Sequence, residues 1–253
     1  MNLWDAIGWQ SPSILACSGA GGKTSVLMTL AACARLHCRT MLLTTTTKMY
    51  WNQVKDWHPV LADDFAEGAA AAERILQTEG LAGWFTGLQE QKVTGLPPQW
   101  IDTLAQRAAF SETYIAVEAD GAKERLIKAS ADCEPVIPVT TAITLGVLSL
   151  EAVGLPLSSA IAHRLELVME ILGKEQGERI DERDLAKLAL HERGIFRHGR
   201  GRQILLLTGG NSEKAARAEP VIDYLRSRCS NITKCIVTEG YGARMKPLKV
   251  VNV

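Results

Sequence analysis

Six short runs of apolar residues, rich in Val, Ile and Leu, recur along this chain and are separated by segments in which apolar residues follow helical spacing. The runs lie at residues 13–18, 40–45, 114–117, 142–148, 203–208 and 232–237. Continuous apolar runs of this length are typical of strands buried on both faces, and the helices between them imply parallel crossover connections. The sequence therefore predicts an α/β fold with a doubly wound, mostly parallel sheet.

Two stretches depart from this alternation. Residues 50–111 contain one clear helical segment, at about 65–77, followed by turn signals at Gly95 and Pro97-Pro98. Residues 158–191 have helical spacing with a break at 173–177. We expect a single α/β domain over residues 1–253, with an elaboration at 50–111 and a small helical lobe at 158–191. The segment 241–253 has no helix signal and predicts either an edge strand or a loose tail.

Composition argues against several functional classes. The 28 Lys and Arg residues equal the 28 Asp and Glu residues in number, so no net charge attracts nucleic acid or an anionic membrane. No apolar stretch is long enough to span a membrane, and the first residues lack the features of a signal peptide. The six cysteines show neither a CxxC pair nor zinc-ligand spacing, which favours buried or reduced thiols. We therefore expect a soluble, cytoplasmic protein with no nucleic acid and no membrane among its partners.

The most informative motif is a glycine-rich string that lies between a predicted strand and a predicted helix. In the phosphate-binding loop pattern G-x-x-x-x-G-K-[ST], Gly22, Lys23 and Thr24 supply the last three positions, whereas Cys17 replaces the first glycine. The remaining glycines still leave a backbone whose N–H groups can surround phosphate oxygens. The candidate nucleotide-binding residues are Gly19, Ala20, Gly21, Gly22, Lys23, Thr24 and Ser25.

The chemistry of this string assigns a role to each polar residue. Lys23 would place its ammonium on the β- and γ-phosphates, and Thr24 would give its hydroxyl to Mg²⁺. A glycine turn that merely joins strand to helix is the alternative, but Lys-Thr at this spacing favours nucleotide binding. A dinucleotide fingerprint would need glycine at Thr24 and an acidic residue at 44–47, where four threonines stand. The sequence therefore predicts a sheet of P-loop NTPase type, with Mg²⁺ and a nucleoside triphosphate, ATP or GTP, as cofactors.

The second and third predicted strands end in polar residues, and parallel sheets build their sites at such ends. Lys48, after the threonine run, is placed to contact a γ-phosphate or a second anionic substrate; the alternative is a surface lysine. Glu118 and Asp120 follow an apolar strand directly, which is costly unless they are paired or hold a metal. With a bound triphosphate, one would hold Mg²⁺ and the other orient a nucleophile. The predicted metal ligands are Thr24, Glu118 and Asp120, and the predicted catalytic residues are Lys23, Lys48, Glu118 and Asp120.

These strings together resemble the YqeC-like bacterial family of accessory proteins for selenium-dependent molybdenum hydroxylases. Members carry a loop like GAGGKT, a run like TTTTKM and a stretch like EADG…K…EPVIP, which correspond here to residues 19–24, 44–49 and 118–138. His163, Arg164 and Glu166 match a further family string, HRxE. The resemblance spans most of the chain, from about Ile14 into the run at 203–208.

The resemblance implies a P-loop nucleotide-binding fold and a role in maturing molybdenum hydroxylases that need a labile selenium atom. It also implies such a hydroxylase, or its cofactor, as a partner. Relatives tend to have a string like Asn-Lys-x-Asp after the strand at 203–208, where this chain has Gly209-Gly210-Asn211-Ser212. Because that string would read the edge of guanine, the base preference stays open.

Further basic residues allow two interpretations each. Lys123, Arg125 and Lys128 follow the two carboxylates and would either neutralise phosphate charge or form an exposed face. His163 is either a site residue or a hydrogen-bonded histidine of the lobe. A basic cluster that precedes the fifth run predicts either a binding surface for a phosphate-rich ligand or an acidic partner, or a solvated loop. Its members are Arg193, Arg197, His198, Arg200 and Arg202.

We therefore expect an Mg²⁺-dependent NTP-binding protein, a P-loop NTPase or phosphotransferase. It would hydrolyse NTP or transfer phosphoryl groups during maturation of a selenium-dependent molybdenum hydroxylase. Two alternatives stay open. One is a nucleotide-binding escort or scaffold protein without turnover, which Cys17 favours, and the other is a small-molecule kinase with its acceptor site at 44–48.

Overall fold

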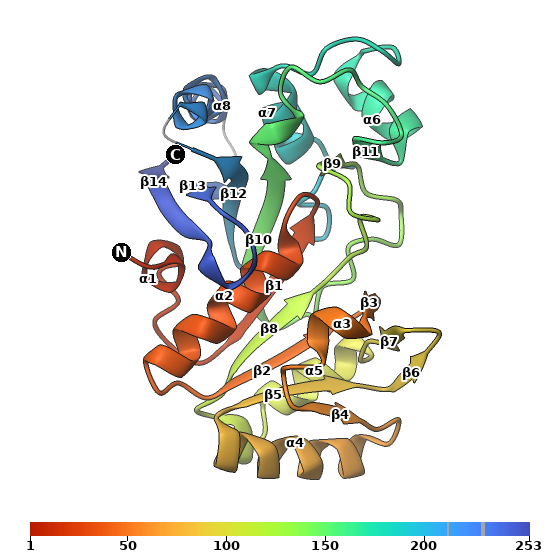
Figure 1. Cartoon of the computed structure of the whole chain (residues 1–253), viewed down its shortest axis with the longest axis vertical. Coiled ribbons are helices and arrows are strands. Elements are labelled where there is room, and N and C mark those ends of the chain that lie inside the picture. The colour runs from red at the N-terminus through yellow and green to blue at the C-terminus, as the bar shows by residue number, and fades with distance from the viewer. Residues whose placement is uncertain (212, 229–230) are drawn as a thin grey trace.

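The centre of the molecule is a nine-stranded sheet. The structure is a computed structural model that describes residues 1–211, 213–228 and 231–253. In spatial order the strands are β14 (Lys246–Asn252), β13 (Ile232–Glu239), β12 (Arg202–Gly210), β10 (Thr141–Ser149), β1 (Ile14–Gly19), β8 (Tyr114–Glu118), β2 (Met41–Thr45), β5 (Leu81–Phe85) and β4 (Pro59–Leu61). Neighbouring strands are parallel except for β13 and β14, which are antiparallel. The predicted α/β fold with a mostly parallel sheet is confirmed (Figure 1).

Each of the six predicted apolar runs forms a strand of this sheet, namely β1, β2, β8, β10, β12 and β13. The C-terminal segment forms the edge strand β14, one of the two conformations expected for it. Strands β4 and β5 were not predicted, although they extend the sheet at the opposite edge. β5 has the sequence LAGWF and β4 has three residues, so Ala, Gly and short length conceal both strands from a pattern analysis.

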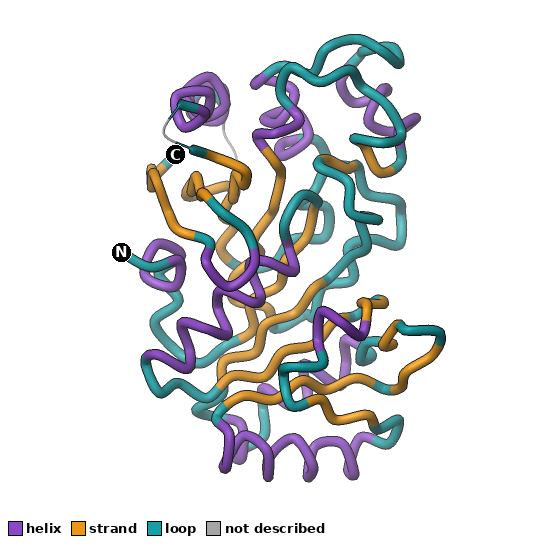
Figure 2. Tube along the Cα trace, viewed as in Figure 1, coloured by secondary structure: helices purple, strands orange, loops and turns teal. Residues whose placement is uncertain are grey.

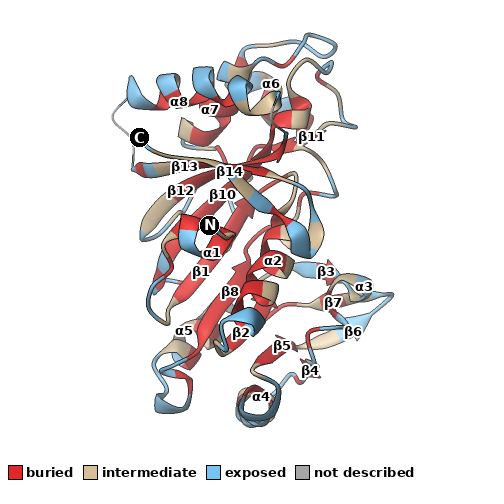
Figure 3. Ribbon diagram, turned by 60° about the vertical axis from the view of Figure 1, so that its left-hand side comes forward, coloured by how far each residue is buried: buried red, intermediate tan, exposed pale blue. Residues whose placement is uncertain are grey.

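Helices cover both faces of the sheet (Figures 1 and 2). α1 (Leu3–Ile7) and α2 (Lys23–Leu36) pack on one face, in one hydrophobic cluster with Leu15 and Cys17 of β1. The alternate residues of the same strand, Ile14 and Ala16, face the opposite way into the cluster beneath α4 (Phe65–Glu79) and α5 (Pro98–Ala105). Because successive side chains of a strand alternate, β1 is buried on both sides. Figure 3 shows the buried strands between the helices.

Three further helices belong to the other half of that second face. α7 (Glu182–Leu190) and α8 (Ala218–Arg226) pack against β12 and β13, and α6 (Leu165–Leu172) joins the same cluster. α6 and α7 lie in the segment expected as a helical lobe. Short 3₁₀ turns occur at η1 (Ala108–Phe110), η2 (Leu150–Ala152), η3 (Lys214–Arg217) and η4 (Gly242–Arg244). Among the described helices, none is long and apolar enough to cross a membrane.

Two small sheets border the carboxyl ends of the central strands. β3 (Lys48–Tyr50), β7 (Lys92–Thr94) and β6 (Gly87–Gln89) form an antiparallel sheet next to α3 (Trp51–Val54). β9 (Ile127–Lys128) pairs with β11 (Ala162–His163). The second pairing joins the loop after β8 to the segment that leads into α6, so residues far apart in the sequence meet there.

The order of the strands creates a crevice beside β1. The chain leaves β1 through α2 toward β2 on one side, and it leaves the neighbouring strand β10 toward β12 on the other side. Loops that diverge in this way leave a crevice outside the carboxyl ends of the strands, where ligands of α/β proteins bind. The glycine-rich string follows β1 directly and therefore lies at this crevice.

The five described cysteines are all free. Cys17, Cys33 and Cys235 are buried, whereas Cys38 and Cys133 are exposed. Burial raises the pKa of Cys235 to about 12, which keeps that thiol protonated. The sixth cysteine, Cys229, lies outside the described residues, as does Ser212 of the string after β12.

Candidate functional site

The turn between β1 and α2 is short and depends on glycine. β1 ends at Gly19 and α2 begins at Lys23, so only residues 20–22 connect them. Gly19, Gly21 and Gly22 have φ angles of 98°, 80° and 139°. A Cβ atom on Gly19 would lie 2.1 Å from the carbonyl oxygen of Val147, so neither the backbone angle nor the space admits a side chain there.

Cys17 does not belong to this turn. It lies within β1, pairs with Leu145 on one side and Glu118 on the other, and is fully buried. Its backbone is extended, so glycine is not required at this position. The departure from the strict loop pattern therefore leaves the conformation of the turn unaffected.

The backbone amides from Gly19 to Ser25 fall into two groups. The first two are used within the protein: Gly19 donates to Asp120 Oδ2 over 3.1 Å, and Ala20 donates to the carbonyl oxygen of Val147 over 2.8 Å. The amides of residues 21–25 have no hydrogen-bond acceptor in the described part of the chain. Free amides at the start of a fourteen-residue helix favour an anion.

Asp120 lies beneath the turn between two lysines. It is fully buried; Lys23 Nζ lies 3.1 Å from its Oδ1 and Lys128 Nζ lies 2.8 Å from its Oδ2. Lys23 also donates to the carbonyl oxygen of Gly19 over 2.6 Å. Burial by itself would raise the pKa of Asp120, but the charges of Lys23 and Lys128 outweigh it and hold that pKa below its ordinary value. Asp120 is therefore a carboxylate that holds Lys23 against the turn.

The same ion pairs continue toward α6. Lys128 donates to the carbonyl oxygen of Gly121 over 2.9 Å and lies 3.2 Å from Glu134 Oε2. Arg164 Nη2 lies 2.7 Å from the same oxygen of Glu134. We call the sequence Lys23, Asp120, Lys128, Glu134 and Arg164 the charge chain; it links the glycine turn to the residue that precedes α6.

His163 lies next to the charge chain in β11. Burial, together with the positive charges of Lys128 and Arg164, lowers the pKa of His163 to about 4. The imidazole is therefore neutral at physiological pH. His163 pairs with Lys128 in the β9–β11 sheet and is not among the described residues that line the cavity at the glycine turn.

Glu118 and Thr24 meet at the start of α2. Thr24 Oγ1 donates to Glu118 Oε2 over 3.0 Å. Burial raises the pKa of Glu118, and the charge of Lys23 and the hydroxyl of Thr24 only partly oppose this. A hydroxyl and a carboxylate in contact are oxygen ligands that suit Mg²⁺. Within the described residues no group of three or more His, Cys, Asp or Glu side chains is arranged to hold a metal ion, so phosphate and water oxygens would have to complete the coordination.

A cavity of about 600 Å³ opens above these residues. The predicted site residues that line it are Gly21, Gly22, Lys23, Thr24, Ser25, Lys48 and Glu118. The other three, Gly19, Ala20 and Asp120, are buried and do not line the cavity. The crevice therefore brings most of the predicted residues to one cavity and leaves Asp120 as their support.

Several lining residues were not singled out from the sequence. Lys92 comes from β7, Tyr50 and Gln53 from β3 and α3, and Glu151 and Tyr241 from segments after β10 and β13. They share no motif with the glycine turn. The fold alone brings these residues to the glycine turn. Each lies in a segment that follows the carboxyl end of a sheet strand, or in a segment that pairs with one.

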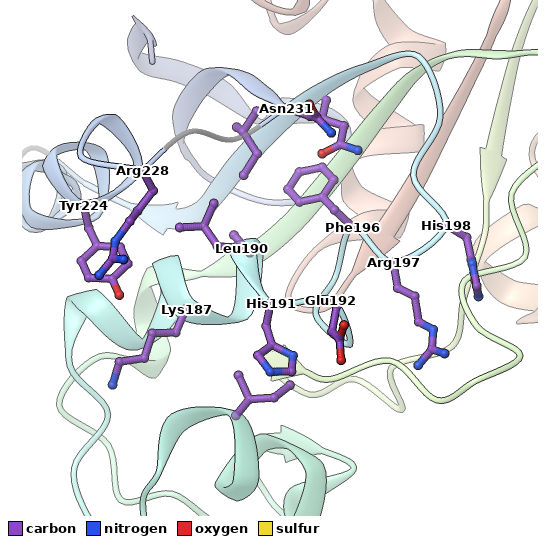
Figure 4. A pocket seen from close by; sticks show the side chains of 14 residues that line it. Lys187, Leu190, His191, Glu192, Phe196, Arg197, His198, Tyr224, Arg228 and Asn231 are labelled. Carbon is purple, nitrogen blue, oxygen red and sulfur yellow. The ribbon is translucent and has the colours of Figure 1, made fainter.

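A second cavity, of about 660 Å³, lies near the amino ends of β12 and β13. Figure 4 shows Lys187, His191, Arg197 and His198 around it. Only Arg197 and His198 of the predicted basic cluster line this cavity.

The other members of the cluster face elsewhere or bind the protein itself. Arg193 pairs with Glu170, and Arg202 donates to the carbonyl oxygens of Ile7 and Gly8. The cluster is therefore divided among separate structural contacts.

The geometry defines the class of protein. A parallel sheet, a glycine turn after its first strand, a helix that begins at Lys-Thr and a carboxylate bonded to that threonine together form an α/β fold of P-loop NTPase type.

Comparison with known proteins identifies the family. The family model described as "YqeC protein" matches residues 15–166. The "Uncharacterized protein YqeC" of Escherichia coli (strain K12) is 31% identical over 189 residues, which cover 74% of this chain and 71% of that protein. The chain belongs to the YqeC family, as the resemblance of its motifs predicted, and the matched range contains every predicted site residue.

The chain is also similar to a solved structure. Chloroplast FtsY from Physcomitrella patens superimposes with a TM-score of 0.44 and 14% identity, over 96% of this chain. The superposition covers 64% of that chain.

Proposed function

We propose that this protein binds a nucleoside triphosphate together with Mg²⁺. It either hydrolyses this nucleotide or transfers a phosphoryl group from it. The single observation that carries the proposal is the convergence at one cavity of free amides, an ammonium and a bonded hydroxyl–carboxylate pair. The amides of residues 21–25, Lys23, Thr24 and Glu118 all belong to the lining of this cavity. Each supplies an interaction that a triphosphate requires.

Each residue has a role in this proposal. The amides of residues 21–25 bind phosphate oxygens, and Lys23 exchanges the carbonyl of Gly19 for the β- and γ-phosphates. Thr24 and Glu118 would hold Mg²⁺, which neutralises phosphate charge when bound. Asp120 orients Lys23 and, among the predicted metal ligands, is the one already engaged by two cations. Lys48 contacts the transferred group or a second substrate.

A second candidate is a nucleotide-binding escort or scaffold without turnover. The observation that favours it is that both carboxylates at the carboxyl end of β8 are already engaged, Glu118 by Thr24 and Asp120 by Lys23 and Lys128. A carboxylate that must orient a nucleophile would first have to leave these partners. Phosphate release from Mg·ATP or Mg·GTP, measured with and without a molybdenum hydroxylase, distinguishes the two candidates.

The biological role belongs to the same proposal. Membership of the YqeC family supports a part in the maturation of a selenium-dependent molybdenum hydroxylase, with that enzyme or its cofactor as the partner. The nucleotide is ATP or GTP.

The test is a set of thermal-shift and calorimetric titrations with ATP and GTP, each with and without Mg²⁺. A ligand at one hundred times its dissociation constant stabilises the native state by about 2.7 kcal/mol, which corresponds to a shift of roughly 5–10 °C for a chain of this size. We expect Lys23→Ala to abolish the shift, whereas Lys55→Ala, an exposed lysine outside the cavity, retains it. Unchanged affinity in a folded Lys23→Ala variant refutes the proposal.

A further inference from the structure

The cavity extends along the sheet well beyond the glycine turn. Its lining follows the strand order: Tyr241 after β13, Glu151 after β10, the turn after β1, residues 121–126 after β8, and Lys48 after β2. The glycine turn therefore lies in the middle of the cavity. A triphosphate held by the amides of that turn leaves the β2 end available for another molecule.

The wall at the β2 end is cationic. It is built from β3, α3 and β7, and it contributes Lys48 and Lys92 to the cavity but no carboxylate. Lys48 is exposed, and its side chain makes no hydrogen bond or ion pair within the described residues. Lys92 Nζ lies 4.5 Å from the ring centre of Tyr50, also without a carboxylate partner in the described part of the chain. Figure 1 shows β3, α3 and β7 side by side next to the carboxyl end of β8.

The loop after β8 crosses the glycine turn toward β10, where the carbonyl oxygen of Leu126 accepts from the amide of Ser149. Lys123, Glu124 and Arg125 line the cavity from this loop, and the side chains of Lys123 and Arg125 form no hydrogen bond or ion pair with any described residue. Lys123 and Glu124 have φ angles of 47° and 59°. Two consecutive residues other than glycine in this region are strained, and such strain concentrates at ligand-binding segments. The backbone is thus held in the conformation that places this loop along the cavity.

We propose that the β2 end of the cavity binds a second, anionic substrate that carries a phosphate group, next to the nucleotide. Lys48 and Lys92 bind the phosphate from this wall, and Lys123 and Arg125 add positive charge elsewhere in the same cavity. Lysine binds phosphate as a point charge. This inference rests on the proposed function, because it takes the glycine turn as the site of the nucleotide.

The test uses pyrophosphate as the probe on the full chain saturated with a non-hydrolysable imidodiphosphate analogue of ATP or GTP, with Mg²⁺ in excess over both. Calorimetry should show pyrophosphate binding to the loaded protein without release of the analogue. Lys92→Ala and Lys48→Ala should each weaken pyrophosphate binding about tenfold, since each removes one charge-assisted contact. Lys55→Ala, an exposed lysine near α3 that does not line the cavity, should leave it unchanged.

The possible results separate the two proposals. Displacement of the bound analogue by pyrophosphate, or equal binding to wild type and both variants, overturns the second site and leaves the proposed function intact. Absence of analogue binding overturns the proposed function and the second site together. Denaturation curves of both variants establish that they are folded, and neither lysine forms an ion pair within the described residues whose loss would unfold the protein.

Discussion

Lys128 stabilises the fold because it is a buried cation between two carboxylates, and its replacement by methionine tests this directly. The side chain is fully buried, 2.8 Å from Asp120 and 3.2 Å from Glu134, and it donates to Gly121 over 2.9 Å. Methionine has a similar length and removes the charge without leaving a large cavity. Loss of one partner of a buried ion pair costs about 3–5 kcal/mol, because the other charge is left uncompensated.

The remaining contacts of Asp120 and Glu134 place the expected cost of losing Lys128 at the lower end of the range of about 3–5 kcal/mol. Asp120 retains Lys23 and the amide of Gly19, and Glu134 retains Arg164. We therefore expect Lys128→Met to lower the free energy of unfolding by about 3 kcal/mol, the lower end of the range. In thermal unfolding this corresponds to a decrease of roughly 6–12 °C for a chain of this size.

The assay is urea unfolding at pH 7, with the slope of free energy against urea compared between variants. Lys55→Met, on an exposed lysine, is the matched control and should change stability by less than about 0.5 kcal/mol. Asp120→Asn combined with Lys128→Met should be more stable than the sum of the single changes predicts, by about 1.5 kcal/mol or more. A cost for Lys128→Met below about 1 kcal/mol, as for an exposed pair, refutes the account of the charge chain.

Three further outcomes follow from the site. Burial raises the pKa of Glu118 because it disfavours the charged carboxylate. Glu118→Gln should therefore increase the free energy of unfolding at pH 7 by about 1 kcal/mol, and it should weaken Mg²⁺-dependent nucleotide binding. Urea unfolding measures the first effect and calorimetry the second, and a loss of stability contradicts the argument. The pKa of His163 is lowered to about 4 from 6.5, so between these pH values the unfolded chain binds a proton that the folded chain does not bind. The free energy of unfolding present above pH 6.5 should therefore fall by about 2 kcal/mol toward pH 4, a value that allows for solvent screening of this half-exposed group. Unfolding of His163→Asn should lack this decrease; an identical pH profile would show that another group is responsible. Gly19→Ala should cost about 2–3 kcal/mol through a strained φ and a clash with Val147, and a variant as stable as wild type in the same assay would show that the turn is less constrained than its backbone angles imply.

The sequence predicts this fold well where the signal is local. Strands buried on both faces leave uninterrupted apolar runs, so β1, β8 and β12 are recognisable from a few residues each. β5 contains Ala and Gly and gains its stability from Trp84 packed under α4, which no local pattern reveals. The glycine turn is also local, since its conformation depends on consecutive residues.

The site is less predictable because pairing between distant segments completes it. Asp120, a predicted Mg²⁺ ligand, also contacts Lys128, which β9 and β11 hold in place and which the motif around Asp120 did not indicate as its partner. Lys92 reaches the cavity because β7 pairs with β3. Each contact depends on how two strands pair, and the paired segments share no sequence motif. Residue type therefore indicates candidate site residues, whereas the fold determines which of them meet.

Lys128, the second lysine in contact with Asp120, affects the free energy of nucleotide binding. If Lys23 turns to a phosphate, it leaves Asp120, and a buried carboxylate without a partner would cost about 3–5 kcal/mol. Asp120 does not lose its only partner, because Lys128 and the amide of Gly19 remain within hydrogen-bonding distance. Lys128 in turn is balanced by Glu134, which Arg164 also contacts. The charge chain thus lowers the free energy needed to release Lys23, and a buried lysine that never touches the nucleotide would strengthen its binding.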